Sequence, residues 1–387
     1  MTSDALSEEP VRIVLVTPFF YPHAGGVETH VRQLARGFAL QGQDVVVLTA
    51  RFDPDLPAQE DLEGYRIARA PCRAVLLNTP IDPAVGRVLK GLKADIVHLH
   101  YPPPLTSYFA VRALQRSPVP ICLTYHCDLY LPGPWGRVLT EAFQRIFLTR
   151  TLARVDRIIV HTRSYGMTSA VLRGRPLEII PSVVDLDRFR PGLDASDIRR
   201  DFALEGKRVL AFTGRLVPHK GVDVILRALA ELPSDVVLLA IGSGPRFAYL
   251  RRLAYRLGVP HRVRFLTEVS DVDLPRYLCA ADLFVFPSQN RLEGFGLAVA
   301  EAMAVGLPVV TADMPGVREV IEPGKEGLLA EPLIASDLAA RIREILDDDA
   351  MRARMAAAAR KRAEQRYGVE TVTGQLLKLY AEVLADR

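Results

Sequence analysis

Two glutamates stand eight positions apart on either side of a glycine-rich turn, in the run Glu293-Gly294-Phe295-Gly296-Leu297-Ala298-Val299-Ala300-Glu301. An apolar strand is predicted before this turn, and a helix is predicted from Glu293 to Ala304. The amides of a first helical turn can bind an anion or a sugar hydroxyl, and glycines let a ligand approach the backbone closely. Glu301, about two turns into the helix, can accept hydrogen bonds from vicinal hydroxyls. The spacing also fits a solvated helix with an acidic start, but the glycines and the preceding strand favour a binding site.

Two cations form a second group, in the run Gly214-Arg215-Leu216-Val217-Pro218-His219-Lys220-Gly221. This run follows a predicted strand and precedes a predicted helix. Arginine offers a planar fork and lysine a point charge, and this combination suits a diphosphate. The run has no Walker pattern, so a P-loop ATPase is not indicated. The alternative interpretation is a connecting loop that carries two surface cations.

Three further candidates come directly after predicted strands. Gly25 and Gly26 open a helix after the first strand, and they are a candidate floor for a phosphate or the reacting sugar, although they do not complete a G-x-G-x-x-G fingerprint. Gly242 ends another strand, and we place it with the residues that bind the donor. His126 follows the strand 121–125, where an imidazole can hydrogen-bond a sugar or a leaving phosphate. A lone histidine is more often structural, so the prediction for His126 depends on the other motifs.

The sequence favours a protein without a metal or a cofactor. His98 and His100 lie one residue apart on a predicted strand and face the same side. No carboxylate or thiol cluster with ligand spacing accompanies them, so we expect histidines of the core or of a cleft rather than metal ligands. The four cysteines contain no C-x-x-C pair and are expected to be free thiols in a reducing compartment.

The elements that must position these residues alternate between short apolar runs and longer amphipathic stretches. This alternation is typical of parallel sheets with crossover helices. One series of strands runs from residue 11 to 180, a polar boundary lies between Asp185 and Gly206, and a second series follows. We therefore expect an α/β protein with two Rossmann-like, doubly wound lobes that face a central cleft, because ligands bind at the carboxyl ends of such strands. The expected division is 1–190, 191–365 and a helix over 366–387 that crosses back to the first lobe.

Composition limits the function classes further. The chain has 387 residues, 49% hydrophobic content and a net charge of +4, which is too weak a charge to argue for nucleic acid. The first ten residues are polar and acidic, unlike a signal peptide, and no apolar run reaches the roughly 18 residues of a spanning helix. We expect a cytoplasmic protein. Residues 131–175 contain eight arginines and only two acidic residues, which indicates either an anion-attracting face or a solvated surface.

Together the motifs resemble the GT-B retaining glycosyltransferases of family 4 (glycosyl transferases group 1), and their order and spacing cover nearly the whole chain. The resemblance rests on Pro18-Phe19-Phe20-Tyr21-Pro22, Gly25-Gly26-Val27-Glu28, Asp95-Ile96-Val97-His98, His126-Cys127-Asp128, the 214–221 loop, Glu293-x7-Glu301 and Gly306-Leu307-Pro308-Val309-Val310. One departure is Thr267, which stands where the family usually has a glycine near the base of the nucleotide.

The resemblance implies a role for each candidate. Arg215 and Lys220 would hold the donor diphosphate, and Glu301 would bind the ribose hydroxyls. Glu293 would bind the donor sugar, near the amides of residues 295–297, with His126 beside the sugar. Gly26 would approach the phosphate. The implied activity is metal-independent transfer of a hexose from GDP-mannose or a UDP-hexose, with retention, to a lipid-linked or glycan acceptor in the synthesis of cell-surface glycoconjugates.

The acceptor side is less specific. Residues 136–154 form a helical pattern in which apolar residues recur at i, i+4 spacing between arginines, which fits either weak contact with an anionic membrane or packing on the protein's own sheet. Two alternative functions are a nucleotide-sugar epimerase or phosphorylase, and a nucleotide-sugar-binding protein without catalysis. An epimerase would release an altered sugar without an acceptor, and a phosphorylase would need a longer chain. A binding protein would not need to keep both Glu293 and Lys220.

Overall fold

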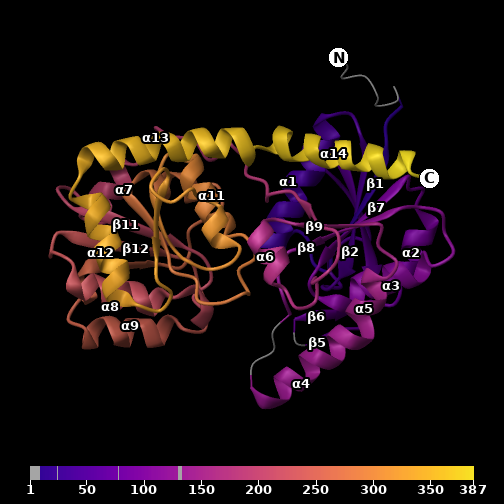
Figure 1. The fold of residues 1–387 in the computed structure, drawn as a ribbon, viewed down its shortest axis with the longest axis horizontal. Helices are drawn as coiled ribbons and strands as arrows, with labels where there is room; N and C mark the ends of the chain where they lie inside the picture. Colours follow the sequence, from indigo (N-terminus) through magenta and orange to yellow (C-terminus); the bar gives the residue numbers. More distant parts are fainter. Residues whose placement is uncertain (1–8, 24, 77, 130–132) are drawn as a thin grey trace. The chain divides into compact units, whose positions relative to one another are not determined.

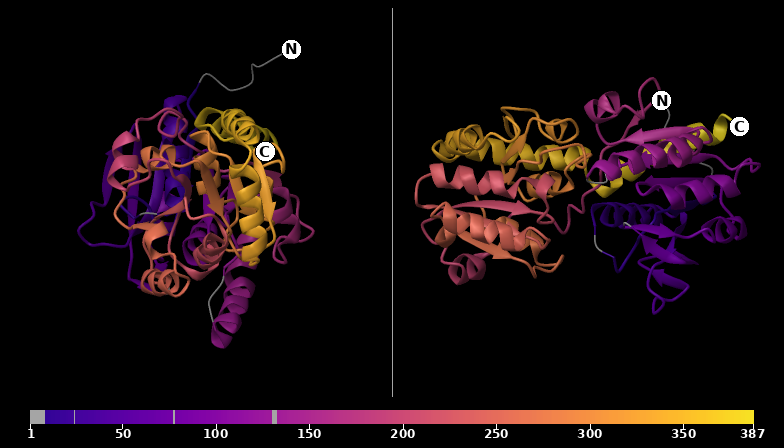
Figure 2. Two further views of the ribbon diagram at one scale, coloured as in Figure 1. Left: turned by 90° about the vertical axis from the view of Figure 1, so that its left-hand side faces the viewer. Right: turned by 90° about the horizontal axis from the view of Figure 1, so that it is seen from below.

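The chain folds into two compact units, each built around its own sheet (Figures 1 and 2). The structure is a computed structural model that describes residues 9–23, 25–76, 78–129 and 133–387. The first unit contains residues 1–183 and 369–387, and the second contains residues 184–368. Among the described residues, no helix combines the length and the apolar character needed to span a membrane.

The first unit is organised by an eight-stranded sheet in the order β10-β9-β8-β7-β1-β2-β4-β3, in which only the β3–β4 pair is antiparallel. The chain turns from one side of β1 to the other between β2 and β7, so the sheet has a topological switch point between β1 and β7. A separate hairpin is formed by β5 and β6. The strands are β1 (Arg12–Val16), β2 (Asp44–Arg51), β3 (Gln59–Leu62), β4 (Tyr65–Pro71), β5 (Ala74–Leu76), β6 (Thr79–Ile81), β7 (Ile96–Tyr101), β8 (Ile121–Tyr125), β9 (Arg157–Val160) and β10 (Glu178–Ile179).

Helices cover both faces of this sheet because its buried strands carry apolar side chains on both sides. Ile13 and Leu15 belong to the core that includes α14, whereas Val14 and Val16 belong to the core on the other face. In Figure 1 the last helix, α14, lies beside α1 in this unit. The helices are α1 (Gly26–Leu40), α2 (Val85–Gly91), α3 (Pro104–Ala113), α4 (Pro134–Phe143), a π-helical turn (Gln144–Leu148), α5 (Thr149–Leu152), α6 (Arg163–Thr168) and α14 (Val369–Ala385).

The second unit has a fully parallel six-stranded sheet in the order β13-β12-β11-β14-β15-β16. Its switch point lies between β11 and β14. The strands are β11 (Arg208–Thr213), β12 (Val236–Ile241), β13 (Val263–Leu266), β14 (Leu283–Phe286), β15 (Val309–Ala312) and β16 (Gly327–Ala330). The helices are α7 (Ser196–Asp201), α8 (Val222–Glu231), α9 (Phe247–Arg256), α10 (Leu274–Cys279), α11 (Leu297–Ala304), α12 (Ala335–Leu346) and α13 (Asp349–Arg366), with 3₁₀ turns at Pro218–Lys220, Pro260–Arg262 and Val317–Glu319.

One local expectation is wrong. The helix predicted from Glu293 begins only at Leu297, because Gly296 takes the left-handed conformation of a cap residue before it. Of the two alternatives for residues 136–154, packing on the protein's own sheet does not account for Val138, Leu139 and Ile146, which are exposed.

The arginine-rich stretch is less available to an anion than its composition indicates. Arg154 is paired with Asp156 at 3.3 Å and also donates to backbone carbonyls, and Arg157 is paired with Asp386 at 2.6 Å. These two arginines therefore have internal electrostatic partners. Arg145 and Arg150 are exposed on the helical segment itself.

Candidate functional site

An ion pair between Lys220 and Glu293 marks the switch point of the second sheet. Lys220 lies in the loop after β11 and Glu293 in the loop after β14, and the two strands are neighbours. The side chains are only 16% and 13% exposed, and the Lys220 ammonium lies 4.8 Å from the centre of the Phe286 ring. An ion pair therefore connects two loops whose paired residues are 73 positions apart in sequence. It lies at the carboxyl ends of the strands, where open parallel sheets bind ligands.

Close backbone packing fixes the loop that carries Lys220. Gly221 has a φ of +73°, and a Cβ at this position would lie 2.1 Å from the carbonyl oxygen of Pro287 at the end of β14. Any larger residue would separate the two loops, so this glycine keeps Lys220 within reach of Glu293.

Gly242 supports the same loop from the neighbouring strand. A Cβ on Gly242 would lie 2.2 Å from the carbonyl oxygen of Gly214, and the Leu216 amide donates to the Ser243 carbonyl at 2.8 Å. The position of Gly242 is thus explained by packing against the 214–216 segment, whatever it contributes to a ligand. Arg215 is exposed in that segment.

Positive charge gathers where the predicted diphosphate contacts lie. Burial lowers the pKa of His219, and the nearby cations Lys220 and Arg215 lower it further, while Glu293 raises it. Arg215 and Lys220 therefore act on one region although Arg215 faces solvent. Phosphate groups are favoured in such a field.

Glu301 lies on α11 and is buried, with 9% exposure. Burial raises its pKa to about 7, and the cations Arg188 and Lys220 oppose that shift. Lys220 therefore lies close to both Glu301 and Glu293, while the roles of the three residues stay predictions. Arg188 was not found from the sequence, because it lies in the segment before β11 and carries no spacing signal.

The glycine-rich turn before α11 combines a buried side chain with a backbone that is a candidate for ligand binding. Gly296 is the cap residue of the helix and Leu297 its first residue, and the Val299 amide of the first turn donates to the Gly296 carbonyl at 2.8 Å. The Phe295 side chain is buried and packs edge-on against Tyr367, with ring centres 5.5 Å apart. Phe295 therefore anchors the turn, and only its backbone remains a candidate for binding.

In the first unit, Gly25 and Gly26 begin α1 after the loop that follows β1. Gly25 is the cap residue, and a Cβ there would meet the Glu28 carboxylate at 2.2 Å. Gly26 is the first helical residue and is exposed, and a Cβ added to it would meet no atom of the described residues within 4 Å. A ligand can therefore approach the backbone at Gly26.

His126 follows β8, but its ring is held inside a cluster of buried histidines. Its Nδ1 lies 3.0 Å from Nε2 of His161, and its Nε2 lies 3.1 Å from Nδ1 of His100. Burial lowers the pKa of His126 well below its ordinary value, so the ring is neutral. The cluster was not predicted as a whole, because its members come from separate elements; it comprises His30, His98, His100, His126 and His161.

His98 and His100 do face the same side of β7, with ring centres 4.5 Å apart. Both nitrogens of His98 are bonded within the core, to Tyr380 at 2.6 Å and to Thr124 at 2.7 Å. His98 is therefore a core histidine, as expected. His100, His30 and His126 each offer one nitrogen to a group in which these atoms lie within 4.8 Å of one another.

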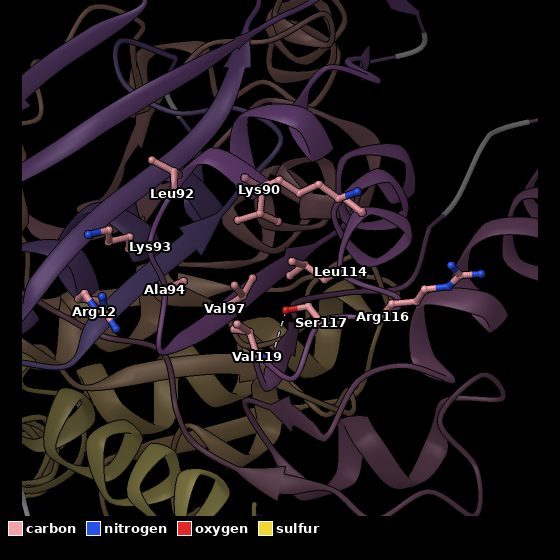
Figure 3. Close-up of a pocket in the computed structure, with 12 residues that line it drawn as sticks. Arg12, Lys90, Leu92, Lys93, Ala94, Val97, Leu114, Arg116, Ser117 and Val119 are labelled. Carbon is pink, nitrogen blue, oxygen red and sulfur yellow. Dashed lines mark hydrogen bonds between the residues drawn. The ribbon is translucent and has the colours of Figure 1, made fainter.

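A cavity of about 520 Å³ lies at the amino ends of the strands of the first sheet, opposite the carboxyl ends where ligands are expected (Figure 3). It is lined by Arg12 at the start of β1 and by Lys90, Lys93 and Arg116, over an apolar floor. Arg12 is already engaged by Asp95, with one hydrogen bond of 2.9 Å. Because this cavity lies at the amino ends of the strands, it is separate from the candidate site.

The fold agrees with comparisons to known proteins. The family model described as "Glycosyl transferases group 1" matches residues 194–362, and "Glycosyltransferase Family 4" matches residues 24–188. The chain is a glycosyltransferase of the GT-B fold and belongs to family 4.

Several relatives are similar over their full length. A D-inositol 3-phosphate glycosyltransferase from Xylanimonas cellulosilytica is 30% identical, over 94% of this chain and 93% of the relative. A GDP-mannose-dependent alpha-(1-6)-phosphatidylinositol monomannoside mannosyltransferase from Mycobacterium tuberculosis is 27% identical, over 94% and 97%. Among solved structures, sucrose-phosphate synthase from Thermosynechococcus elongatus has a TM-score of 0.80 at 26% identity, over 97% of this chain and 100% of that chain.

Proposed function

We propose that this glycosyltransferase moves a hexose from a nucleoside-diphosphate sugar, with GDP-mannose as the first choice, to a lipid-linked or glycan acceptor. The observation that carries the proposal is the mostly buried Lys220–Glu293 pair at the switch point, with Glu301 close to Lys220. A nucleotide sugar requires a cation for its phosphates and hydrogen-bond acceptors for its hydroxyls, close to one another. The GDP-mannose-dependent relative and the inositol phosphate relative favour this donor and a phosphorylated or lipid-linked acceptor.

In this proposal each group has a defined task. Lys220 turns from Glu293 to the diphosphate, and Arg215 adds a second cation from the same loop. Glu293 is then available to accept hydrogen bonds from sugar hydroxyls, beside the amides of Phe295, Gly296 and Leu297. Glu301 accepts from the ribose hydroxyls, while Gly242 shapes the phosphate loop.

The cations also support transfer without a metal. Negative charge develops on the leaving diphosphate during transfer, and two fixed cations with a helix start can stabilise it there. Retention of the anomeric configuration is part of the proposal, and the resemblance to the retaining enzymes of family 4 supports it. The roles predicted for Gly25, Gly26 and His126, which belong to the first unit, remain part of the proposal.

The test is transfer to a lipid extract with a panel of GDP-mannose and UDP-hexoses, in the presence of EDTA. We expect one donor to be consumed, and Arg215→Ala, Lys220→Ala and Glu293→Ala to lower kcat/KM at least tenfold. Lys325→Ala, an exposed lysine of the same unit, is the control. Full activity of Lys220→Ala would contradict the assigned role, and NMR of the product reports its anomeric configuration.

We also propose weak, peripheral contact with an anionic membrane on the cytoplasmic face, through the 134–152 helical segment. Trp135 is 78% exposed there, and Val138, Leu139 and Ile146 are exposed as well. Apolar side chains next to exposed arginines suit an interface with anionic lipids.

Flotation with anionic vesicles tests the membrane contact. We expect partial flotation that Leu139→Glu and Ile146→Glu remove, whereas Val272→Glu on the second unit, at a residue that is 79% exposed, leaves it unchanged. Absence of wild-type flotation would contradict the proposal.

A further inference from the structure

The hydrogen bonds of the histidine cluster determine which nitrogens carry protons. Nδ1 of His161 lies 3.1 Å from the backbone carbonyl of Ile180, and a carbonyl can only accept, so His161 carries its proton on Nδ1. An imidazole with its one proton on Nδ1 has an acceptor at Nε2. His126 must therefore donate from Nδ1 to His161, at 3.0 Å.

This assignment leaves Nε2 of His126 without a proton, since the neutral ring carries only one. In the metal-free protein that lone pair accepts a hydrogen bond from Nδ1 of His100, at 3.1 Å. The ring of His126 is thus fixed in the tautomer in which one nitrogen donates to an anchored partner and the other presents a lone pair. This is the arrangement of a metal-ligating histidine.

His30 is oriented in a similar way from α1. Its Nδ1 lies 2.9 Å from the hydroxyl of Ser182, so when the serine accepts, Nε2 of His30 carries a lone pair. The His30 ring lies edge-on to its neighbours, with ring centres 5.1 Å from His126 and 5.7 Å from His100.

We propose that His30, His100 and His126 bind a transition-metal ion of the Zn²⁺ class. One nitrogen from each lies within 4.8 Å of the others. Two nitrogens at about 2.0–2.1 Å from one tetrahedral zinc ion are about 3.3 Å apart, which the 3.1 Å between His100 and His126 already approaches. Three neutral imidazoles without a carboxylate or a thiolate favour Zn²⁺, Co²⁺, Ni²⁺ or Cu²⁺ over Mg²⁺ or Ca²⁺.

Binding requires one proton to change place. Nδ1 of His100 carries the proton that points at His126, and this proton is lost when the ion binds. His100 then takes a proton on Nε2, a buried nitrogen that has no hydrogen-bond partner among the described atoms. The ion replaces the hydrogen of the His100–His126 bond, while His161 and Ser182 keep their bonds to the other two ligands. A water or an anionic group completes the coordination.

The site has a consequence for transfer that rests on the proposed function. The ion engages the His126 ring that this function places beside the sugar, so we expect Zn²⁺ to inhibit the transferase reversibly. The ion is not needed for the donor diphosphate, which Arg215 and Lys220 serve in the other unit. Binding itself does not depend on this consequence.

Titration of the full chain with Co²⁺, after treatment with a chelator, tests the site through the visible absorption of tetrahedral cobalt. We expect one equivalent to bind, Zn²⁺ to displace it, and His30→Gln and His100→Gln to lose the signal. His98→Gln is the matched control, because His98 is equally buried in the cluster and bonds to Tyr380 and Thr124 instead.

Ser182→Ala keeps the test valid if the histidine variants do not fold. Loss of this outer partner should weaken metal binding about 10- to 100-fold, with all three ligands retained. A wild-type protein without the cobalt signal, or variants that all bind like the wild type, would overturn the site. If cobalt binds but no donor is turned over, the proposed function fails and the metal site stands.

Discussion

The Lys220–Glu293 pair allows a test in which stability and activity should separate. Lys220→Ala leaves the Glu293 carboxylate mostly buried without its cation and removes the contact with the Phe286 ring. The double variant Lys220→Ala/Glu293→Ala removes both charges together. If the pair exists for the donor rather than for the fold, the second substitution should restore stability and leave activity lost.

The expected sizes follow from burial. Removal of one partner from a buried pair costs about 3–5 kcal/mol, and because both side chains keep some exposure we expect about 2–3 kcal/mol for Lys220→Ala. At about 2–4 °C per kcal/mol for a unit of this size, the melting temperature should fall by roughly 4–12 °C. The double variant should recover most of this loss, apart from about 0.5–1 kcal/mol for the cation–π contact.

Differential scanning calorimetry and initial rates provide the two measurements. We expect kcat/KM to fall about 100-fold in the single variant and to stay there in the double variant, because a charged contact to the leaving group is missing in both. Lys325→Ala, which breaks an exposed pair with Glu322, should change neither measurement. The reasoning is refuted if the double variant regains activity, or if Lys220→Ala melts like the wild type.

Three further predictions concern buried groups and close contacts. Because burial raises the pKa of Glu301 from 4.5 to about 7, the folded state binds a proton more tightly than the unfolded chain. The stability of the protein should therefore fall as the pH rises from about 4.5 to 7. Glu301→Gln should remove this pH dependence in thermal melts. Burial likewise raises the pKa of Asp82 from 3.8 to about 7, so the wild type should lose stability between these pH values. Asp82→Asn should therefore gain more melting temperature over the wild type at pH 8 than at pH 4, and an equal gain at both values would contradict this. Gly242→Ala should destabilise the protein by about 2–3 kcal/mol in denaturant titrations, because its Cβ would lie 2.2 Å from the Gly214 carbonyl, whereas Gly26→Ala should unfold like the wild type.

The sequence predicts short, uniformly apolar strands better than strands in which polar and apolar residues mix. The apolar run 11–17 is found as β1 and the run 308–311 as β15, because each is a short hydrophobic segment between turn residues. Strand β3, at the edge of the first sheet, and its neighbour β4 were not predicted. Their polar and apolar residues mix, as in Tyr65–Pro71, and their pairing depends on a partner that only the fold supplies.

The candidate site was predictable where a motif is local and not where the fold assembles it. Lys220 and Glu293 each lie in a glycine-bounded loop after an apolar strand. The topology of a parallel sheet therefore predicts that both residues lie at the carboxyl ends of the strands. The direct pairing of their side chains does not follow, since 73 residues separate them. No sequence spacing links His30 and His161 to the cluster around His126. His30 lies on α1, and His161 comes directly after β9.

The order in which the ribosome makes this chain has a consequence for its folding. The core of the first unit includes Leu376 and Tyr380 of α14, which are translated after the whole of the second unit. Domains usually fold in the order of synthesis, but here the first sheet must wait with an uncovered apolar face while the second unit, made from one uninterrupted segment, folds ahead of it. A nascent chain that stops before residue 369 should therefore hold a finished second unit and a first unit that chaperones still recognise.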